Sequence, residues 1–360
     1  MSENKKVIYF NHWFSSMECL IDDLKTRYGD NIKIIASSSN MYATYKNIAD
    51  TFIVTNETVP EWLDICEKYD VDLFFCRDKF DIVDGQALLK FRELSVDIVL
   101  DKNKFIDDKA EFYKLADLTC RFNKFPDIVV PYYVTFETCR TKAEVMDTLR
   151  NTLAYLALNN LTPTFKLING EGGASYREIR IKDTTSYNSI MYPNGRVLSY
   201  DSAINLFNNM SLEEAKTLMI MEKLKGPEIS IDCYNSKSLG LIAYGREKAD
   251  RRQVIIDCQT TKNNDYLEMK RLAIEIANKF NLKNPFNIQF MRSAKTGSLA
   301  VLEVNSRMSG GCYMLTPLGI NLCDIVIKDR LGDGVDDTDI KFSNGTSESI
   351  VARVEKPILM

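Results

Sequence analysis

The stretch from Phe286 to Gly311 constrains the fold of this chain more than any other feature, and it reads FNIQFMRSAKTGSLAVLEVNSRMSGG. Apolar and polar residues alternate in both halves, which is the period of half-buried strands, and a glycine between the halves permits a tight turn. The pattern predicts an antiparallel hairpin that turns near residues 295 to 297. One face of this hairpin then carries three oxygen-bearing side chains, Gln289, Glu303 and Asn305.

Oxygen donors of this kind suit Mg²⁺, which usually takes one or two protein ligands and completes its shell with water and substrate phosphates. We therefore predict that Gln289, Glu303 and Asn305 hold Mg²⁺, or Mn²⁺ in its place. An amphipathic hairpin with a wet outer face explains the same alternation, so the spacing alone leaves both interpretations open.

The composition excludes several classes of protein. With 360 residues, the chain is long enough for two or three domains with substantial cores. Its 46 basic and 50 acidic side chains leave a net charge of −4, and no basic stripe indicates a nucleic-acid partner. We see no apolar run of 18 residues and no secretory leader, so we expect a cytoplasmic protein without a membrane partner. Because His12 is the only histidine, we do not expect Ser/His/Asp or Cys/His catalysis.

The first 100 residues alternate β-rich runs with helical patterns, which predicts a Rossmann-like layer around a parallel sheet. Apolar residues at helical spacing cover Met17–Tyr28 and Pro60–Tyr69. The GxGxxG fingerprint is absent, which disfavours an NAD-dependent enzyme. Residues 37 to 40 could line a ligand cleft or form a plain polar loop. The β-rich runs are residues 6–10, 32–37, 50–55, 71–76 and 96–100.

Two later segments have features that suit a nucleotide. Lys166 lies in a predicted strand that runs into a glycine loop, where backbone N–H groups can close over phosphate oxygens. This is not a Walker loop, and a glycine-rich turn is a weak signal by itself. Further on, a turn at Gly226-Pro227 leads into a strand whose polar face carries Glu228. A helix over Tyr266–Phe280 is expected to bury Leu267, Leu272, Ile276 and Phe280.

The ExNxR and SGG motifs at Glu303 to Gly311 resemble the metal-binding strand of ATP-grasp enzymes. The FNIQF run before them resembles the carbamoyl phosphate synthase-like branch, where glutamine takes the first metal position. Further signatures occur upstream in the family's order. The resemblance implies an α/β fold, with a Rossmann-like pre-ATP-grasp domain at 1–100 and an ATP-grasp domain at 101–360. The latter would have two α+β subdomains, with the lid subdomain at about 126–222.

The resemblance also implies a set of site residues. Asp101-Lys102 and Asp108-Lys109 both match the family's Asp-Lys pair, and we favour Lys109 because a helix capped by Asp107 or Asp108 follows it. Many members have an acidic residue where Met221 stands, and Glu222 could supply that contact to the adenine amino group. The implied ATP-binding residues are Lys109, Lys166, Gly172, Gly173, Glu222, Lys223, Leu224 and Glu228. The implied catalytic residues are Arg307, Lys166 and Arg246, and Ser309, Gly310 and Gly311 would bind the acceptor.

By this resemblance, the expected activity is carboxylate-amine ligation through an acylphosphate, with ATP and Mg²⁺ (or Mn²⁺) as cofactors. The expected partners are small carboxylates and an amine or ammonia, and a homodimer is compatible with the sequence. Two alternatives remain open, namely a biotin-carboxylase-like carboxylase and a non-catalytic ATP-binding regulatory protein. A carbamoyl phosphate synthase is disfavoured, because 360 residues hold a single ATP-grasp unit.

Overall fold

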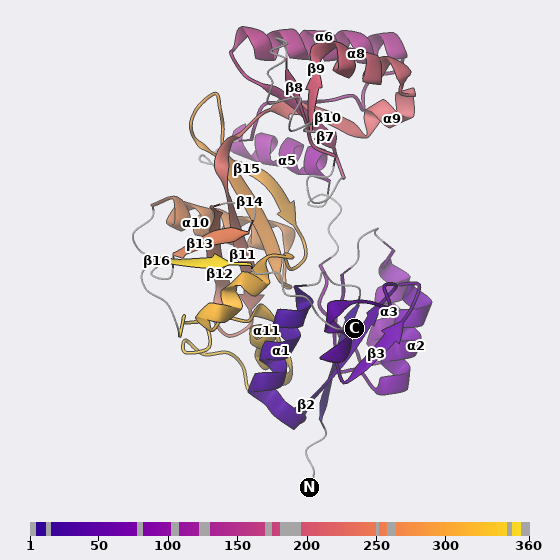
Figure 1. Ribbon diagram of the computed structural model, residues 1–360, viewed down its shortest axis with the longest axis vertical. Coiled ribbons are helices and arrows are strands. Elements are labelled where there is room, and N and C mark those ends of the chain that lie inside the picture. Colours follow the sequence, from indigo (N-terminus) through magenta and orange to yellow (C-terminus); the bar gives the residue numbers. More distant parts are fainter. Residues whose placement is uncertain are drawn as a thin grey trace. The chain divides into compact units, whose positions relative to one another are not determined.

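Figure 1 shows the computed structural model of the protein, which describes residues 5–11, 16–77, 82–101, 108–121, 130–169, 175–180, 196–249, 252–257, 264–343 and 348–353. By its contacts, the chain forms two compact units. The first unit comprises Met1–Lys102, Ile229–Ile288 and Asn305–Met360, and the second comprises Asn103–Glu228 and Gln289–Val304. The predicted domains, 1–100 and 101–360, group the chain differently and stay a prediction. Among the described residues, no helix is long and apolar enough to cross a bilayer.

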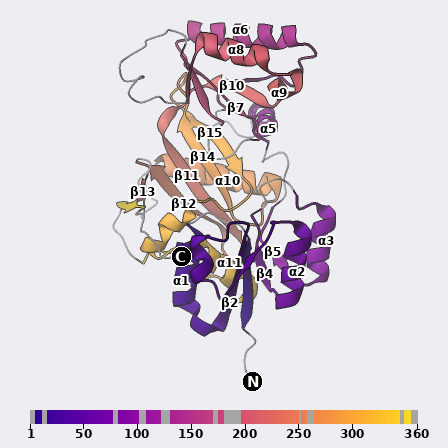
Figure 2. The same ribbon diagram turned by 45° about the vertical axis from the view of Figure 1, so that its right-hand side comes forward.

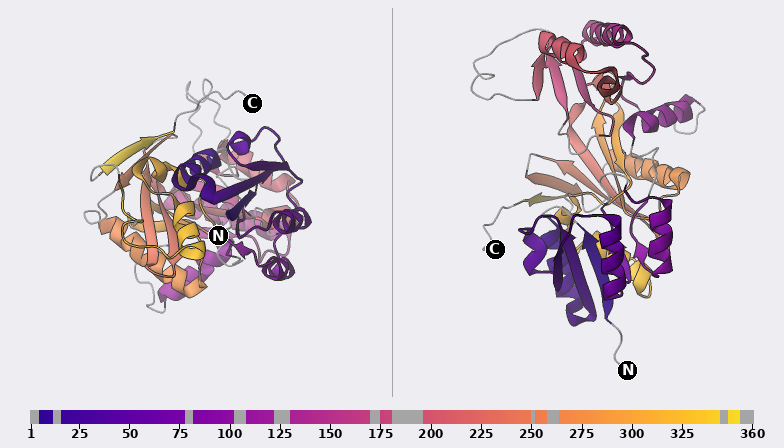
Figure 3. Two further views of the ribbon diagram at one scale, coloured as in Figure 1. Left: turned by 90° about the horizontal axis from the view of Figure 1, so that it is seen from below. Right: turned by 90° about the vertical axis from the view of Figure 1, so that its right-hand side faces the viewer.

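The N-terminal part of the first unit is a parallel sheet with helices on both faces (Figure 3), as predicted for a Rossmann-like layer. Its elements are β1 (Lys6–Asn11), α1 (Met17–Tyr28), η1 (Gly29–Asn31), β2 (Ile32–Ser38), η2 (Thr44–Asn47), β3 (Thr51–Val54), α2 (Val59–Tyr69), β4 (Leu73–Phe75), α3 (Gly85–Glu93) and β5 (Asp97–Ile98). The strand order is β3-β2-β1-β4-β5. Successive side chains of β1 pack on opposite faces of the sheet, in two separate hydrophobic cores. Phe10 stacks on Phe75 at 4.7 Å in the core with α1, and Tyr9 stacks on Phe74 at 4.4 Å in the core with Trp62 of α2.

The rest of the first unit is built on an antiparallel ladder. Its elements are β11 (Lys225–Ser236), β12 (Gly240–Lys248), β13 (Gln253–Asp257), α10 (Asn264–Phe280), β14 (Phe286–Arg292), β15 (Leu299–Asn305), η3 (Cys312–Leu318), α11 (Leu322–Leu331) and β16 (Glu348–Ala352). The strand order is β15-β14-β11-β12-β13-β16. The first four residues of β11, the last four of β14 and all of β15 except Asn305 belong to the second unit. Opposite residues include Asp232 and Tyr244, and Ser230 and Arg246.

The predicted helix over residues 266–280 is α10, but two of its four expected buried residues are not buried. Leu267 is 49% exposed and Phe280 is half-buried, whereas Leu272 and Ile276 are buried as predicted. The buried face instead begins at Tyr266 and continues through Met269, since a helical stripe advances by three or four residues.

The second unit contains a mixed sheet covered on one face by two helices, α6 (Lys142–Leu158) and α8 (Tyr200–Asn209), which lie together in Figure 1. Its strands are β6 (Tyr133–Thr135), β7 (Pro163–Leu167), β8 (Arg177–Arg180), β9 (Val197–Ser199) and β10 (Leu218–Glu222), in the order β6-β10-β7-β8-β9. Leu153 of α6, Phe207 of α8 and Phe165 of β7 belong to one buried cluster. The unit also contains α5 (Lys109–Arg121) and α9 (Leu212–Lys216).

Strands β14 and β15, drawn side by side in Figure 2, confirm the predicted hairpin. At its turn, the Ser293 N–H donates to the Ser298 carbonyl at 2.9 Å, and Gly297 has φ +75°, which glycine adopts without strain. The apolar face is buried as expected. The polar face is not uniformly wet, because Asn287 is 0% exposed.

Candidate functional site

Lys109 lies where three distant segments of the second unit meet. Asp108 caps α5 as predicted, since its Oδ1 accepts from the Glu111 N–H at 2.9 Å, and this places Lys109 in the first turn. The Lys109 side chain is buried, with Nζ 3.3 Å from the Ile168 carbonyl oxygen and 3.5 Å from Glu303 Oε2. The structure therefore joins the predicted phosphate lysine to a predicted metal ligand.

Lys166 is the second buried lysine of this cluster. It lies in β7 opposite Met219 of β10, and its Nζ is 6.0 Å from the centre of the Tyr113 ring. Burial and the nearby charge of Lys109 lower the pKa of Lys166 to about 7, against the opposite effect of Glu303. Within the described residues, no hydrogen bond or ion pair reaches its ammonium group. An anionic ligand would therefore stabilise the charged form of this lysine.

Tyr113 was not predicted as part of the site. Its side chain is 0% exposed, and its hydroxyl donates to the Leu302 carbonyl of β15, next to Glu303. The aromatic residue thus ties α5 to the strand that carries a metal candidate. In the sequence it is one apolar position of a helical stripe, so no local signal distinguishes it.

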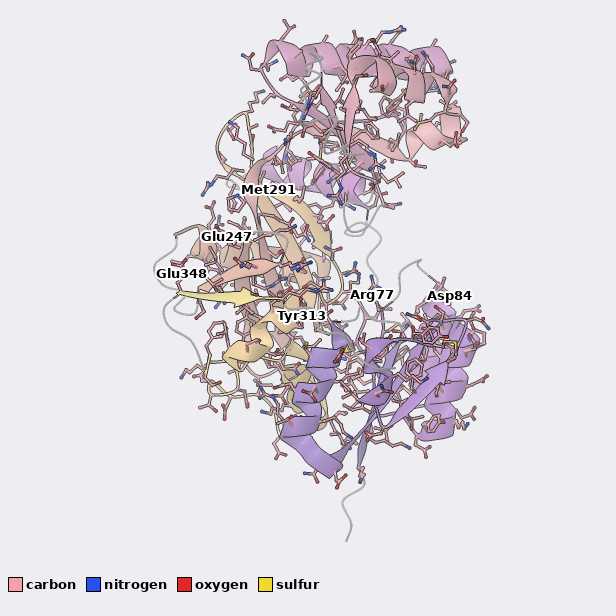
Figure 4. All side chains as sticks on the ribbon, viewed as in Figure 1. Arg77, Asp84, Glu247, Met291, Tyr313 and Glu348 are labelled. Carbon is pink, nitrogen blue, oxygen red and sulfur yellow. The ribbon has the colours of Figure 1, made fainter. Side chains whose placement is uncertain are left out.

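The predicted adenine hinge, residues 222–224, follows β10. Its first two N–H groups are already used, since Glu222 donates to Tyr132 at 3.0 Å and Lys223 donates to Thr162 at 2.7 Å. Leu224 is buried, and its N–H has no hydrogen-bond partner in the described part of the chain. Leu224 packs in an apolar cluster with Met221, Ala300, Tyr133, Leu302 and Met291, which Figure 4 labels.

The Glu222 carboxylate holds the hairpin turn. It is 2% exposed and accepts hydrogen bonds from the N–H groups of Tyr132, Ala294 and Lys295 and from the Ser293 hydroxyl. These internal donors engage both of its oxygens, so the arrangement gives no support to the expected contact with an adenine amino group. Its partners, Tyr132 just before β6 and the residues of the turn, are too far away in sequence to be inferred from a local motif.

The predicted metal ligands lie on the two hairpin strands. Gln289 on β14 and Glu303 on β15 are half-buried in the second unit, and Asn305 is a half-buried position two residues after Glu303 on the same strand. One carboxylate and two amides, all outside the core, are a donor set that fits Mg²⁺. Their metal role stays a prediction.

A second cluster lies in the first unit around Arg246 of β12. Its Nε is 2.6 Å from Asp232 Oδ2, its Nη2 donates to Ser309 Oγ at 3.1 Å, and its guanidinium lies against Gly311. The structure therefore brings a predicted catalytic arginine together with two predicted acceptor-binding residues. Asp232, which is 1% exposed, was not predicted as a site residue.

Several of the remaining predicted residues have partners of their own. The Arg307 Nη1 donates to the Met308 carbonyl at 3.4 Å, and the Gly310 carbonyl accepts from Ser16 Oγ at 3.1 Å. Glu228 is half-buried in β11, and the Lys223 ammonium pairs with Glu178 at 2.6 Å. Lys102, Gly172 and Gly173 lie outside the described residues.

The parallel Rossmann-like layer and the antiparallel sheet of the first unit, together with the helix-covered mixed sheet of the second, make up an ATP-grasp fold. Solved structures share this fold. N5-carboxyaminoimidazole synthetase from Staphylococcus aureus, complexed with ADP, is 12% identical and has a TM-score of 0.65 over 93% of this chain and 80% of that one. The biotin carboxylase domain of 2-oxoglutarate carboxylase from Hydrogenobacter thermophilus, complexed with MgADP, ADP and bicarbonate, is 14% identical and has a TM-score of 0.63 over 96% of this chain and 73% of that one.

Sequence comparisons agree with the fold. Residues 214–355 match a family described as ATP-grasp in the biosynthetic pathway with Ter operon. An 82-residue segment is 30% identical to the arginine-specific large chain of carbamoyl phosphate synthase from Eremothecium gossypii, which covers 22% of this chain and 7% of that protein. The match over residues 214–355 and the shared fold agree with the ATP-grasp resemblance that the motifs predicted.

Proposed function

We propose that the protein is an ATP-dependent carboxylate-amine ligase that forms a carbon-nitrogen bond through an acylphosphate and releases ADP and phosphate. The main support is the cluster of Lys109, Lys166 and Glu303, which joins two buried lysines to a carboxylate. Two lysines can balance the charge of a triphosphate, and a carboxylate beside them suits the divalent ion that accompanies it. The match of residues 214–355 to an ATP-grasp family supports the same assignment.

In this proposal, different groups of residues bind different parts of ATP. The Leu224 N–H would donate to the adenine edge, with the cluster of Met221, Met291 and Leu302 as an apolar wall. Lys109 and Lys166 would bind phosphate oxygens. Mg²⁺ or Mn²⁺, when bound by Gln289, Glu303 and Asn305, would neutralise charge on the transferring phosphoryl group.

The reaction then proceeds in two balanced steps. An oxygen of the substrate carboxylate attacks the γ-phosphorus, the bond to the β-phosphate oxygen breaks, and ADP leaves. The nitrogen of a neutral amine or ammonia next attacks the acyl carbon, phosphate leaves with the bonding electron pair, and the nitrogen loses a proton. Arg307 and Arg246 would stabilise negative oxygens in these steps, and the Ser309 to Gly311 segment would bind the acceptor. No Ser or Cys nucleophile is required, because the acylphosphate is already activated.

A second candidate is carboxylation, in which bicarbonate is the acid. It is favoured by the two similar structures, whose names describe a carboxyaminoimidazole synthetase and a biotin carboxylase domain, the latter with bicarbonate bound. Both candidates use the same groups for ATP and differ only in the acid. A third candidate is an ATP-binding regulatory protein without turnover, against which the predicted metal set argues.

The test is a screen for phosphate release. The protein is incubated with Mg-ATP and pools of carboxylic acids, each with and without pools of amines or ammonia, and with bicarbonate as a separate acid. We expect ADP and phosphate in equal amounts only when an acid and an amine are both present. Release with bicarbonate alone as the acid would select the carboxylase. ATP binding with no release in any pool would contradict both enzymatic proposals, and a Glu303→Gln variant serves as the control for contaminating ATPases.

A further inference from the structure

The guanidinium of Arg246 is held on two of its edges. Asp232 Oδ2 accepts from Nε at 2.6 Å, and Ser309 Oγ accepts from Nη2 at 3.1 Å. Asp232 is itself fixed, since its Oδ1 accepts from Asn287 Nδ2 at 2.8 Å, and the same Nδ2 donates to the Ile231 carbonyl at 3.1 Å. Three neighbouring strands therefore fix the direction of one arginine.

Gly311 leaves the space that this arginine occupies. A Cβ atom on Gly311 would lie 2.6 Å from Arg246 Nη1, which is closer than real Cβ atoms approach other groups. The backbone of Gly311 has φ −102°, which any residue can adopt. Glycine therefore leaves room for the guanidinium in its present position, whereas a Cβ atom would require the end of the arginine to shift.

Burying an arginine-aspartate pair costs desolvation free energy, which the attraction between the two ions offsets only in part. Arg246 is 8% exposed and Asp232 is 1% exposed, so both ions have lost most of their hydration. A pair that served stability alone could be replaced by apolar side chains of similar size at little cost. The pair instead directs a cation at the 309–311 segment, which is the arrangement that binding an anion requires.

We propose that Asp232 and Gly311 are positioning residues, which orient Arg246 to hold an oxygen of the acceptor's anionic group. Asp232 does so by fixing the Nε edge, and Gly311 does so by admitting Nη1. The inference rests on the proposed function only for the identity of the anion, a carboxylate. Whatever reaction follows, the arrangement predicts an oxyanion-binding position at Arg246 and residues 309–311, which we call the oxyanion seat.

The test uses inorganic phosphate as the oxyanion probe. Calorimetric titration measures phosphate binding to the full-length protein with saturating Mg-ADP, for wild type, Asp232→Asn, Gly311→Ala, Arg246→Ala and the double variant Gly311→Ala/Arg246→Ala. Two changes in the same unit serve as controls. Asp97→Asn removes a partner that lies 2.7 Å from Arg330, and Gly85→Ala adds a methyl group where no atom lies within 4 Å.

We expect Asp232→Asn and Gly311→Ala each to weaken phosphate binding about tenfold, with unchanged ADP affinity, while both controls bind phosphate as wild type does. In the Arg246→Ala background, Gly311→Ala should have no further effect, because the group that it displaces is gone. With an active acid-amine pair, the same two variants should raise KM for the acid and leave KM for ATP unchanged.

Three results would overturn the inference. The first is that Arg246→Ala binds phosphate as tightly as wild type does. The second is that Gly311→Ala weakens phosphate binding equally in the wild-type and Arg246→Ala backgrounds. The third is that the variants lose affinity for ADP together with affinity for phosphate. If Asp232→Asn does not fold, the effect of Gly311→Ala in the wild-type and Arg246→Ala backgrounds still tests the inference. Failure of every acid-amine pair in the turnover screen would refute the proposed ligase but not the oxyanion seat, which the phosphate titration tests separately.

Discussion

Replacing Glu222 by glutamine tests whether this buried carboxylate anchors the hairpin turn or contacts the nucleotide. Its Oε1 accepts from the Tyr132 N–H at 3.1 Å. Its Oε2 accepts from the N–H groups of Ala294 at 3.0 Å and Lys295 at 3.2 Å. The Ser293 hydroxyl lies 3.1 Å from one oxygen and 3.3 Å from the other.

A glutamine amide offers one acceptor oxygen where the carboxylate offers two. The better orientation of the amide keeps its oxygen near Ala294 and Lys295 and turns its NH₂ group toward the Tyr132 N–H. One buried donor without a partner costs about 1–3 kcal/mol, and loss of the negative charge weakens the remaining bonds. We therefore expect Glu222→Gln to lower the free energy of unfolding by roughly 2–4 kcal/mol.

Urea unfolding, read together with hydrogen exchange at residues 130–133 and 293–295, measures this loss. Glu214→Gln in the same unit is the matched control. Glu214 accepts from the Ser211 N–H in an exposed capping box, where water can replace the lost bond, so its loss should be far smaller. The ratio of ATP to GTP affinity should be the same in wild type and Glu222→Gln. If Glu222→Gln were as stable as wild type but its ratio of ATP to GTP affinity fell tenfold, the anchoring role would be refuted and a contact with the base would be indicated.

Three further predictions concern the lysine-carboxylate cluster. Lys166→Met should be more stable than wild type below pH 7 without nucleotide, and its advantage should shrink by up to about 1.4 kcal/mol per pH unit above that. The reason is that the pKa of Lys166 is about 7 in the folded protein and 10.5 in the unfolded chain. A difference in the free energy of unfolding between variant and wild type that does not change with pH would contradict this. Glu303→Gln and Asn305→Ala should each reduce ADP formation on the order of 10² to 10³-fold while the fold is kept, and near-normal turnover in either would rule out its metal role. Tyr113→Phe should lower the free energy of unfolding by about 1 kcal/mol through loss of its bond to Leu302, and unchanged unfolding would show that this bond adds nothing.

Periodic patterns carried most of what the sequence predicted of the fold. The helix predicted at Met17–Tyr28 has those bounds, and the hairpin predicted from residue 286 onward turns at Gly297. These features are local, because alternation and helical spacing are fixed by the backbone of the element itself. Leu267 shows the limit, since its spacing is compatible with the apolar stripe and only packing decides which side of the stripe is buried.

The roles that the sequence analysis did not predict depend on partners in other segments of the chain. Glu222 binds a turn 71 to 73 residues away, and Tyr113 binds a carbonyl 189 residues away. Asp232 lies in β11, and its pairing with Arg246 depends on the ladder between β11 and β12. Sequence motifs can identify groups that meet a ligand, whereas the groups that hold them in place emerge only when the strands are paired.

The central claim, that a carboxylate attacks the γ-phosphorus of ATP, is tested most directly by isotope transfer. An acid that supports turnover is labelled with ¹⁸O in its carboxylate, and the released phosphate is analysed by mass spectrometry. An acylphosphate route carries one labelled oxygen into each phosphate and leaves ADP, because the oxygen that attacks phosphorus leaves with it. Unlabelled phosphate, or recovery of AMP and pyrophosphate, would contradict the proposed mechanism.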